Sequence, residues 1–236
     1  FGYERLMPNL DTANPEVWEY FCAVGEYWVR EFGIDGWRLD VASEVDDAFW
    51  REFRRRVKAV DPDALLIGEV WELMRYRKQL VAAQLGVLDS HDVSRFLSLC
   101  GGDERRHRLA VLFQMCFPGM PSVFYGDELG VAGVLEADYR SPMPWQGGDA
   151  ESLAFYKRAI ALRRTLAPLQ RGEFRALDAR RGSGLFAFAR EYGGERVTVA
   201  LNCTERAENF APAGEMLWSE GLAGGKIGPY GFAVSI

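Results

Sequence analysis

The sequence is poor in the residues that usually bind metals or form disulfides, with two histidines and four cysteines among 236 residues. Cys22, Cys100, Cys116 and Cys203 are widely spaced and include no CxxC pair, which argues against a zinc site or a disulfide scaffold. Three of them lie in apolar surroundings. We therefore expect reduced, buried thiols, as in a cytoplasmic protein.

The chain also lacks a long apolar run and an excess of positive charge. No segment approaches the length that crosses a bilayer, and no signal peptide precedes Phe1. The formal net charge is −6, which argues against a nucleic-acid partner. One basic cluster is interpreted as the solvated side of a helix: Arg51, Arg54, Arg55, Arg56 and Lys58. Membrane and nucleic-acid partners are thus not expected, and we expect a cytoplasmic location.

Three acidic residues stand at the ends of apolar runs. Asp40 ends the run GIDGWRLD, Glu69 ends LLIGE, and Asp92 closes VLDSHD. Each run is typical of a buried parallel strand. Each acid therefore lies where a strand opens into its loop, the place at which α/β barrels and sheets hold catalytic groups. Three such carboxylates indicate acid chemistry on a neutral substrate.

The segments around these acids predict alternating helices and strands. A helix begins at Asn14-Pro15 and ends at Gly33, since Asn is a good N-cap and Pro suits the first helical turn. Strand 34–40, helix 46–60 and strand 64–69 form a βαβ unit. The following elements are expected at 74–83 (helix), 85–90 (strand), 104–116 (helix), 121–127 (strand) and 151–166 (helix). His107 is expected on a solvated helix face.

The pattern changes near residue 170. Beyond it, short stretches of β-forming residues such as LFAFA and VTVAL are separated by glycine-containing turns. Short strands at near-regular spacing predict a small antiparallel β-sandwich. We therefore expect two domains, a catalytic α/β domain over 1–170 and an all-β domain over 171–236.

The three carboxylates suit glycoside hydrolysis. A retaining enzyme needs an acid for the leaving oxygen and a nucleophilic carboxylate about 5–5.5 Å away. Neighbouring strands lie about 4.8 Å apart, so Asp40 and Glu69 at equivalent ends of adjacent parallel strands meet that spacing. Asp92 would orient hydroxyls and stabilise positive charge. Arg38, two residues before Asp40, points to the same side, and His91 would donate to a sugar hydroxyl.

Several motifs resemble the α-amylase family of glycoside hydrolases. Residues 36–42 (GWRLDVA), 68–71 (GEVW) and 90–92 (SHD) resemble three of its conserved regions. The segments FPG at 117–119, YGDE at 125–128 and RSPMPW at 140–145 resemble its eighth-strand segment and the loop that follows. Residues 7–11 (MPNLD) and 41–45 (VASEV) are similar to the MPxLN and VANEV segments of the neopullulanase, cyclomaltodextrinase and maltogenic amylase group, with Asp and Ser in place of Asn.

This resemblance implies a role for each residue. Asp40 would be the nucleophile, Glu69 the general acid/base and Asp92 the transition-state stabiliser. Arg38 and His91 would contact the sugar at the cleaved bond. Glu44 and Trp71 would line neighbouring subsites. By contrast, Trp37, Tyr125 and Trp145 are interpreted as core or loop packing.

The resemblance further implies a (β/α)₈ TIM barrel, of which only the C-terminal part is represented. A barrel takes about 250 residues, and only four strand candidates precede residue 130. Strands 1–3 and 6 have no counterpart, nor does the N-terminal module through which the neopullulanase group forms homodimers. Two explanations stay open: the sequence is part of a longer protein, or it is a truncated product whose open sheet edges seek a partner. No metal ligands are identifiable, and calcium is the one cofactor left open.

These observations predict a retaining α-glucan hydrolase that cleaves α-1,4 bonds of maltooligosaccharides, cyclodextrins or pullulan, with transglycosylation as a second outcome. The alternative is a non-catalytic fragment that binds glucan or a complementary chain. An amylase-like protein of a transporter is a weaker interpretation, because this chain has the catalytic acids and no membrane span.

Overall fold

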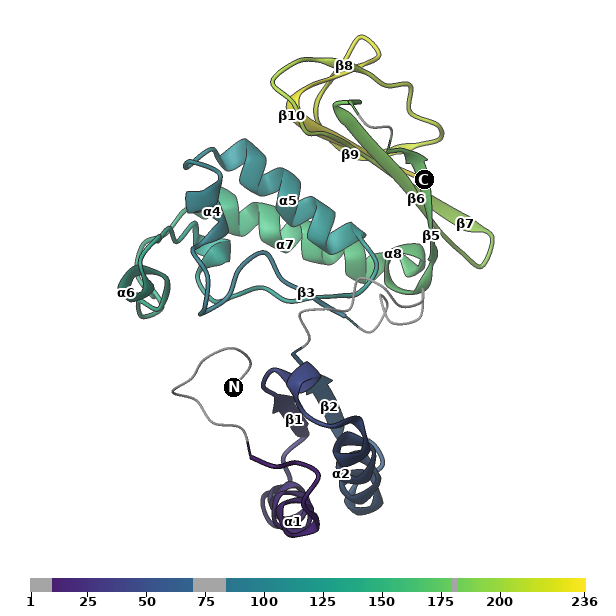
Figure 1. The fold of residues 1–236 in the computed structure, drawn as a ribbon. Coiled ribbons are helices and arrows are strands. Elements are labelled where there is room, and N and C mark those ends of the chain that lie inside the picture. Colours follow the sequence, from purple (N-terminus) through teal and green to yellow (C-terminus); the bar gives the residue numbers. More distant parts are fainter. Residues whose placement is uncertain (1–9, 70–83, 180–181) are drawn as a thin grey trace. The chain divides into compact units, whose positions relative to one another are not determined.

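The computed structural model describes residues 10–69, 84–179 and 182–236. The chain divides into two compact units, Phe1–Arg77 and Lys78–Ile236. The predicted helix at 74–83 lies outside the described residues. Each unit is described by itself below (Figure 1).

The first unit holds the predicted βαβ arrangement, and its elements are α1 (Pro15–Phe32), β1 (Gly36–Leu39), α2 (Asp47–Val60) and β2 (Leu65–Gly68). Helix α1 begins as the sequence predicts, because the Asn14 side chain accepts from the backbone N–H of Glu16 at 2.9 Å. It ends at Gly33, whose φ of 61° is left-handed, a conformation that glycine adopts without steric cost.

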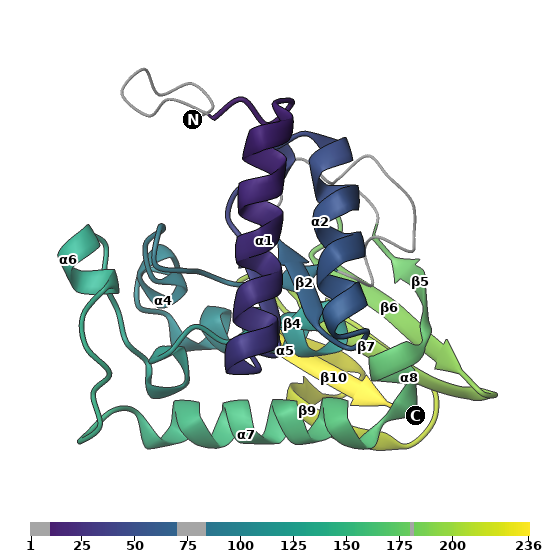
Figure 2. The same cartoon turned by 90° about the horizontal axis from the view of Figure 1, so that it is seen from below.

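Strands β1 and β2 pair in parallel, with Gly36 opposite Leu65 and Leu39 opposite Gly68. Helices α1 and α2 lie side by side (Figure 2). The apolar faces of the helices meet the strands in one core, made of Cys22, Val29, Phe49, Phe53, Val57 and Ala64, with Trp37, Leu39 and Leu66 packed against it.

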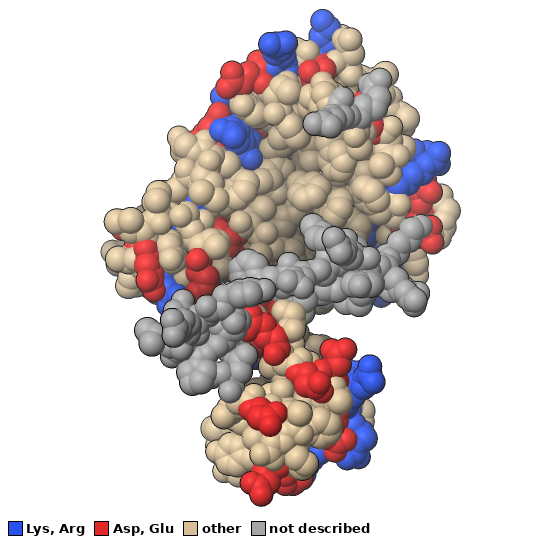
Figure 3. All heavy atoms as spheres, in the orientation of Figure 1, with Lys and Arg blue, Asp and Glu red and all other residues tan. Residues whose placement is uncertain are grey.

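One basic residue of α2 departs from the expected solvated face. The Arg56 guanidinium is largely buried and pairs with Glu26 and Glu19 of α1, at 2.8 Å for the latter. These carboxylates raise the pKa of Arg56. Arg51, Arg54 and Arg55 are exposed as predicted. On the face seen in Figure 3, Lys and Arg are scattered among Asp and Glu and form no basic patch.

The second unit begins with helices and short strands, namely β3 (Leu85–Gly86), α4 (Phe96–Leu99), α5 (Glu104–Cys116), β4 (Met120–Pro121), α6 (Glu136–Tyr139), α7 (Ala150–Thr165) and α8 (Ala167–Arg171). Helices α5 and α7 follow the prediction closely. Strands β3 and β4 are shorter than predicted, because their parallel ladder joins only two residue pairs. The Gln114 side chain extends this contact by donating to the carbonyls of Gly86 and Ser122, both at 2.8 Å.

The C-terminal part forms one curled antiparallel sheet of β5 (Glu173–Asp178), β6 (Leu185–Tyr192), β7 (Glu195–Asn202), β8 (Glu208–Asn209), β9 (Met216–Ala223) and β10 (Lys226–Ser235). The order is β5-β6-β7-β10-β8, with β9 also paired to β10. The described residues thus form a single sheet in place of the expected two-sheet sandwich. One apolar face of this sheet packs on helices: Phe188, Val199 and Phe232 share one core with Leu112 of α5 and Tyr156 of α7. A second apolar cluster is buried among the strands themselves, made of Leu185, Ala187, Ala200, Ile227 and Ala233.

The predicted boundary near 170 coincides with the change from helices to sheet, between α8 and β5. That the sheet is a separate domain stays a prediction.

The expectation that His107 lies on a solvated helix face is wrong. Its side chain is buried, because α5 packs against α7 on that side, and its Nε2 lies 3.3 Å from the Tyr156 hydroxyl.

Cys22, Cys100 and Cys116 are buried free thiols, as expected, whereas Cys203 is exposed. Burial raises the pKa of the Cys116 thiol to about 12, so this thiol is unreactive at neutral pH. Across the described ranges, no helix is long and apolar enough to cross a membrane.

Candidate active site

Asp40 and Glu69 directly follow the paired ends of β1 and β2. The Leu39–Gly68 pair is the last of the ladder, so the two acids occupy the next positions on adjacent strands. The backbone continues the pairing beyond them: the N–H of Glu69 donates to the carbonyl of Leu39 at 2.9 Å, and that of Ala42 to the carbonyl of Glu69 at 2.8 Å. The expected juxtaposition of the two acids is thus observed.

Arg38 bridges both carboxylates. Its Nη1 pairs with Oδ1 of Asp40, and its Nη2 lies 2.7 Å from Oε2 of Glu69. The cation offsets the repulsion of two negative charges held on neighbouring strands. The Asp40 side chain is 69% exposed and that of Glu69 21%. Asp40 is therefore the more accessible of the pair.

The residue after Asp40 adopts an unusual backbone conformation. Val41 has φ 35° and ψ 53°, in the left-handed region, which costs a non-glycine residue about 1–3 kcal/mol. This conformation directs the Val41 N–H to Oε2 of Glu69, at 3.2 Å. The strained turn therefore contributes directly to the orientation of the second carboxylate.

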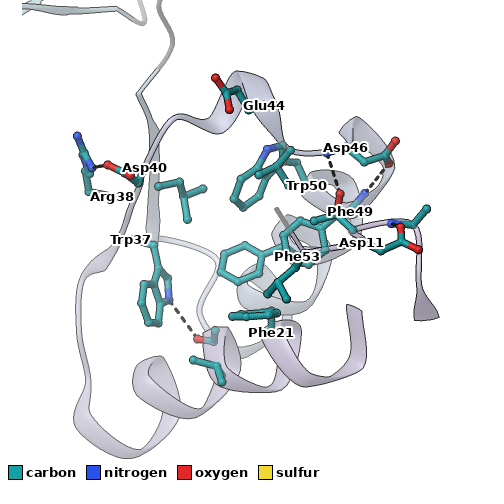
Figure 4. A pocket seen from close by; sticks show the side chains of 17 residues that line it. Asp11, Phe21, Trp37, Arg38, Asp40, Glu44, Asp46, Phe49, Trp50 and Phe53 are labelled. Carbon is teal, nitrogen blue, oxygen red and sulfur yellow. Dashed lines mark hydrogen bonds and ion pairs between the residues drawn. The ribbon is translucent and has the colours of Figure 1, made fainter. Parts of the chain in front are cut away.

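A groove of about 680 Å³ lies beside this turn in the first unit (Figure 4). The aromatic residues of its lining are Phe21, Trp37, Phe49, Trp50 and Phe53. Arg38, Asp40 and Glu44 also border it. Trp37 is half-buried and donates its indole N–H to the carbonyl of Gly25 at 3.2 Å, which agrees with its predicted packing role. Glu44 is exposed on the short 3₁₀ turn Ala42–Glu44.

In the second unit, His91 and Asp92 form a cluster with Arg140. Arg140 was not among the predicted site residues. Arg140 Nη2 lies 2.9 Å from Oδ1 of Asp92, and Arg140 Nε donates to the carbonyl of His91 at 2.8 Å. His91 Nε2 lies 3.2 Å from the other Asp92 oxygen, and Glu136 lies 3.3 Å from Arg140 Nε. The sequence feature that could have identified Arg140 is the motif RSPMPW, which begins at this residue.

Asp92 lies in a turn six positions after β3 and not at the predicted strand end. A buried ionic network supports this loop. Arg95 is fully buried and donates to Oδ1 of Asp127 at 2.9 Å and to the carbonyl of Tyr125 at 2.8 Å. Asp89, three residues before Asp92, accepts from the N–H of Phe96 at 2.6 Å. Burial, together with the charge of Asp89, raises the pKa of Asp127 to about 8, and burial also raises the pKa of Asp89.

The remaining sequence candidates are placed as follows. Trp71 lies outside the described residues. The Tyr125 hydroxyl donates to the carbonyl of Ser141 at 2.6 Å, whereas Trp145 is 86% exposed and so departs from the expected packing. No group of three or more His, Cys, Asp or Glu within the described ranges is arranged to hold a metal ion.

Comparison with known proteins decides the family. The profile "Alpha amylase, catalytic domain" matches residues 2–84 and 73–152, well over half of the chain. The chain belongs to the alpha-amylase family. The resemblance inferred from the motifs is therefore confirmed.

Relatives within the alpha-amylase family share much of the sequence. Neopullulanase 2 of Thermoactinomyces vulgaris is 42% identical over 83% of this chain and 41% of its own length. Intracellular maltogenic amylase of Bacillus subtilis (strain 168) is 34% identical over 70% of this chain and 36% of its own length. A solved cyclomaltodextrinase structure matches all of this chain with TM-score 0.83 and 34% identity, over 51% of that chain. The chain thus spans less than half the length of these two curated relatives.

Proposed function

We propose that this alpha-amylase family chain carries the catalytic groups of a retaining α-glucan hydrolase. The bonds cleaved are α-1,4 linkages of maltooligosaccharides, cyclodextrins or pullulan. One observation carries the proposal: Asp40 and Glu69 follow the last paired residues of two parallel strands, and Arg38 contacts both. The names of the relatives, a neopullulanase, a maltogenic amylase and a cyclomaltodextrinase, support the substrate class.

The proposed reaction is a double displacement. Asp40 attacks the anomeric carbon while Glu69 protonates the leaving glycosidic oxygen, which forms a covalent glycosyl–Asp40 ester. Glu69 then removes a proton from water, which attacks the same carbon and releases Asp40. When a sugar hydroxyl replaces water, the outcome is transglycosylation. Asp92, paired with Arg140, stabilises the positive charge of the transition state. Arg38 and His91 contact the sugar at the cleaved bond, and Glu44 and Trp71 line neighbouring subsites.

The experiment measures turnover of a maltooligosaccharide by the purified chain and by Asp40→Ala and Glu69→Ala. Each change should lower kcat by about 10³-fold or more. On an aryl α-maltooligosaccharide, whose aryloxide leaving group needs no protonation, azide should then restore Asp40→Ala with a β-glycosyl azide as product and Glu69→Ala with an α-glycosyl azide, because the azide enters by one displacement in the first case and completes two in the second. Glu31→Gln, an exposed carboxylate of α1, serves as the control and should keep the wild-type rate. Wild-type turnover in either alanine variant would refute the proposal.

The second candidate is a non-catalytic fragment that binds glucan or a complementary chain. Its supporting observation is the exposed aromatic side of α1, with Tyr20, Tyr27, Trp28 and Phe32 between 41% and 66% exposed, in a chain that spans less than half of its relatives. A purified chain of 26.6 kDa that binds a maltooligosaccharide without turnover would favour this candidate.

A cytoplasmic location is supported by the name of the intracellular relative.

A further inference from the structure

The turn after Asp40 is anchored from helix α2. The indole N–H of Trp50 donates to the carbonyl of Ala42 at 2.8 Å. The Trp50 ring is itself held edge-on against Phe49 and Phe53, with ring centroids 5.0 and 5.8 Å apart. Among the described residues, Trp50 is the one helical side chain that hydrogen-bonds to this turn. The anchor is therefore packed among aromatic rings and comes from outside the two strands.

The peptide groups on the other side of the same turn face Glu69. The Ala42 N–H donates to the Glu69 carbonyl at 2.8 Å, and the Val41 N–H donates to the Glu69 carboxylate at 3.2 Å. Val41 is left-handed, and such a conformation of a β-branched residue persists only where its surroundings impose it. The hydrogen bond from Trp50 to the Ala42 carbonyl is one of the contacts that constrain this turn.

We propose that Trp50 is a positioning residue for the Asp40–Glu69 pair. Its indole N–H fixes the Ala42 peptide, which holds Val41 in its strained conformation and keeps the Val41 N–H directed at the acid/base carboxylate. This role rests on the proposed function. It predicts that loss of the indole N–H impairs turnover more than it impairs substrate binding, since Trp50 acts through the orientation of reacting groups.

The experiment is a double-mutant cycle in the full chain, with kcat and KM measured on a maltooligosaccharide. Trp50→Phe keeps a packed ring but removes the donor, and should lower kcat about tenfold with KM within about twofold of the wild-type value. In a Val41→Gly background the same change should lower kcat by less than about threefold, because glycine adopts the left-handed conformation without needing the anchor. Trp50→Tyr, which restores a donor on an aromatic ring, should recover kcat to within about threefold of wild type.

The matched control is Trp18→Phe. It also removes an indole hydrogen bond in the same unit, that to the carbonyl of Thr12, and should leave kcat unchanged. An equal loss of kcat from Trp50→Phe in both backgrounds, or an unchanged kcat, overturns the positioning role. Asp40→Asn is assayed alongside: if it retains turnover, the proposed function itself fails and this role with it. If Asp40→Asn is inactive while Trp50→Phe has wild-type kcat, only the positioning role fails.

Discussion

The Arg38 guanidinium on β1 lies 2.7 Å from the Glu69 carboxylate that follows β2, although the two residues are 31 positions apart in sequence. The crossover through α2 returns the chain to the neighbouring parallel position, so one cation contacts the carboxylates at both strand ends. A single arginine in a planar, two-pronged geometry therefore links the two proposed reacting groups.

The first prediction concerns this link. Arg38→Lys should lower kcat/KM about tenfold, and Arg38→Met by about 10² or more, because lysine is a single-point donor and methionine leaves two close carboxylates without a cation. Steady-state kinetics on a maltooligosaccharide measures both. Arg55→Met, which removes an exposed arginine paired with Glu52, should leave kcat/KM unchanged. Equal values for Arg38→Met and the wild type would contradict the prediction.

The second prediction concerns Arg140. Arg140→Met removes the ion pair with Asp92 and the hydrogen bond to the His91 carbonyl. Both kcat and kcat/KM should fall about tenfold or more, because a charge-assisted contact to the proposed transition-state stabiliser is lost. Arg105→Met provides the control, since Arg105 pairs with Asp103 on an exposed helix start. A change in KM alone would contradict the expected effect on turnover.

The third prediction follows from Asp127. Its pKa in the folded chain is about 8, against an ordinary value of 3.8. Between these values the folded chain holds a proton that the unfolded chain has released. The resulting contribution to stability is complete below pH 3.8 and is lost as the pH rises toward 8. Denaturant unfolding at pH 6 to 9 should show a free energy of unfolding that falls with pH, by at most about 1.4 kcal/mol per pH unit for one proton.

Asp127→Asn should flatten this dependence, because the amide does not titrate. The control Glu195→Gln changes an exposed carboxylate at the start of β7 and should leave the slope unchanged. An unaltered slope in Asp127→Asn would show that another group is responsible.

The fourth prediction concerns the loss of stability in acid that the buried His107 causes. Burial, and secondarily Arg108, lowers the pKa of His107 to about 4 from 6.5. The unfolded chain then binds the extra proton first, so stability decreases as the pH falls from 6.5 to 4. His107→Gln should reduce that loss in unfolding experiments, whereas His91→Gln, which changes an exposed ring, should not. Identical acid sensitivity in both variants would contradict the assignment.

The fifth prediction concerns the buried Arg190. Its guanidinium donates to the carbonyl of Cys116 at 2.8 Å, at the end of α5, and to that of Gly172 at 2.9 Å. Burial lowers the pKa of Arg190 to about 10, so it stays charged at neutral pH. Arg190→Met leaves both carbonyls without this donor and should lower the free energy of unfolding by about 2–4 kcal/mol. Arg175→Met, on the exposed strand β5, is the control and should change it by about 0.5 kcal/mol or less.

The sequence by itself determined the local elements and the neighbourhood of Asp40 and Glu69. Helix α1 follows from Asn14, Pro15 and Gly33, because caps act within a few residues. The placement of the two acids on adjacent strand ends follows from the βαβ pattern, because parallel strands joined by one helix present their carboxyl ends together. The motifs around these acids were sufficient to indicate the alpha-amylase family.

Only the tertiary structure decided features that depend on what packs against an element. His107 is buried because α7 covers its side of α5, and Arg56 is paired because α1 lies beside α2. The β-rich segment forms one sheet, with one apolar face covered by α5 and α7 and a second apolar cluster buried among its own strands. The strained Val41 and its anchor Trp50 leave no local pattern in the sequence. Their relationship is set by hydrogen bonds between separate elements, which exist only once the chain has folded.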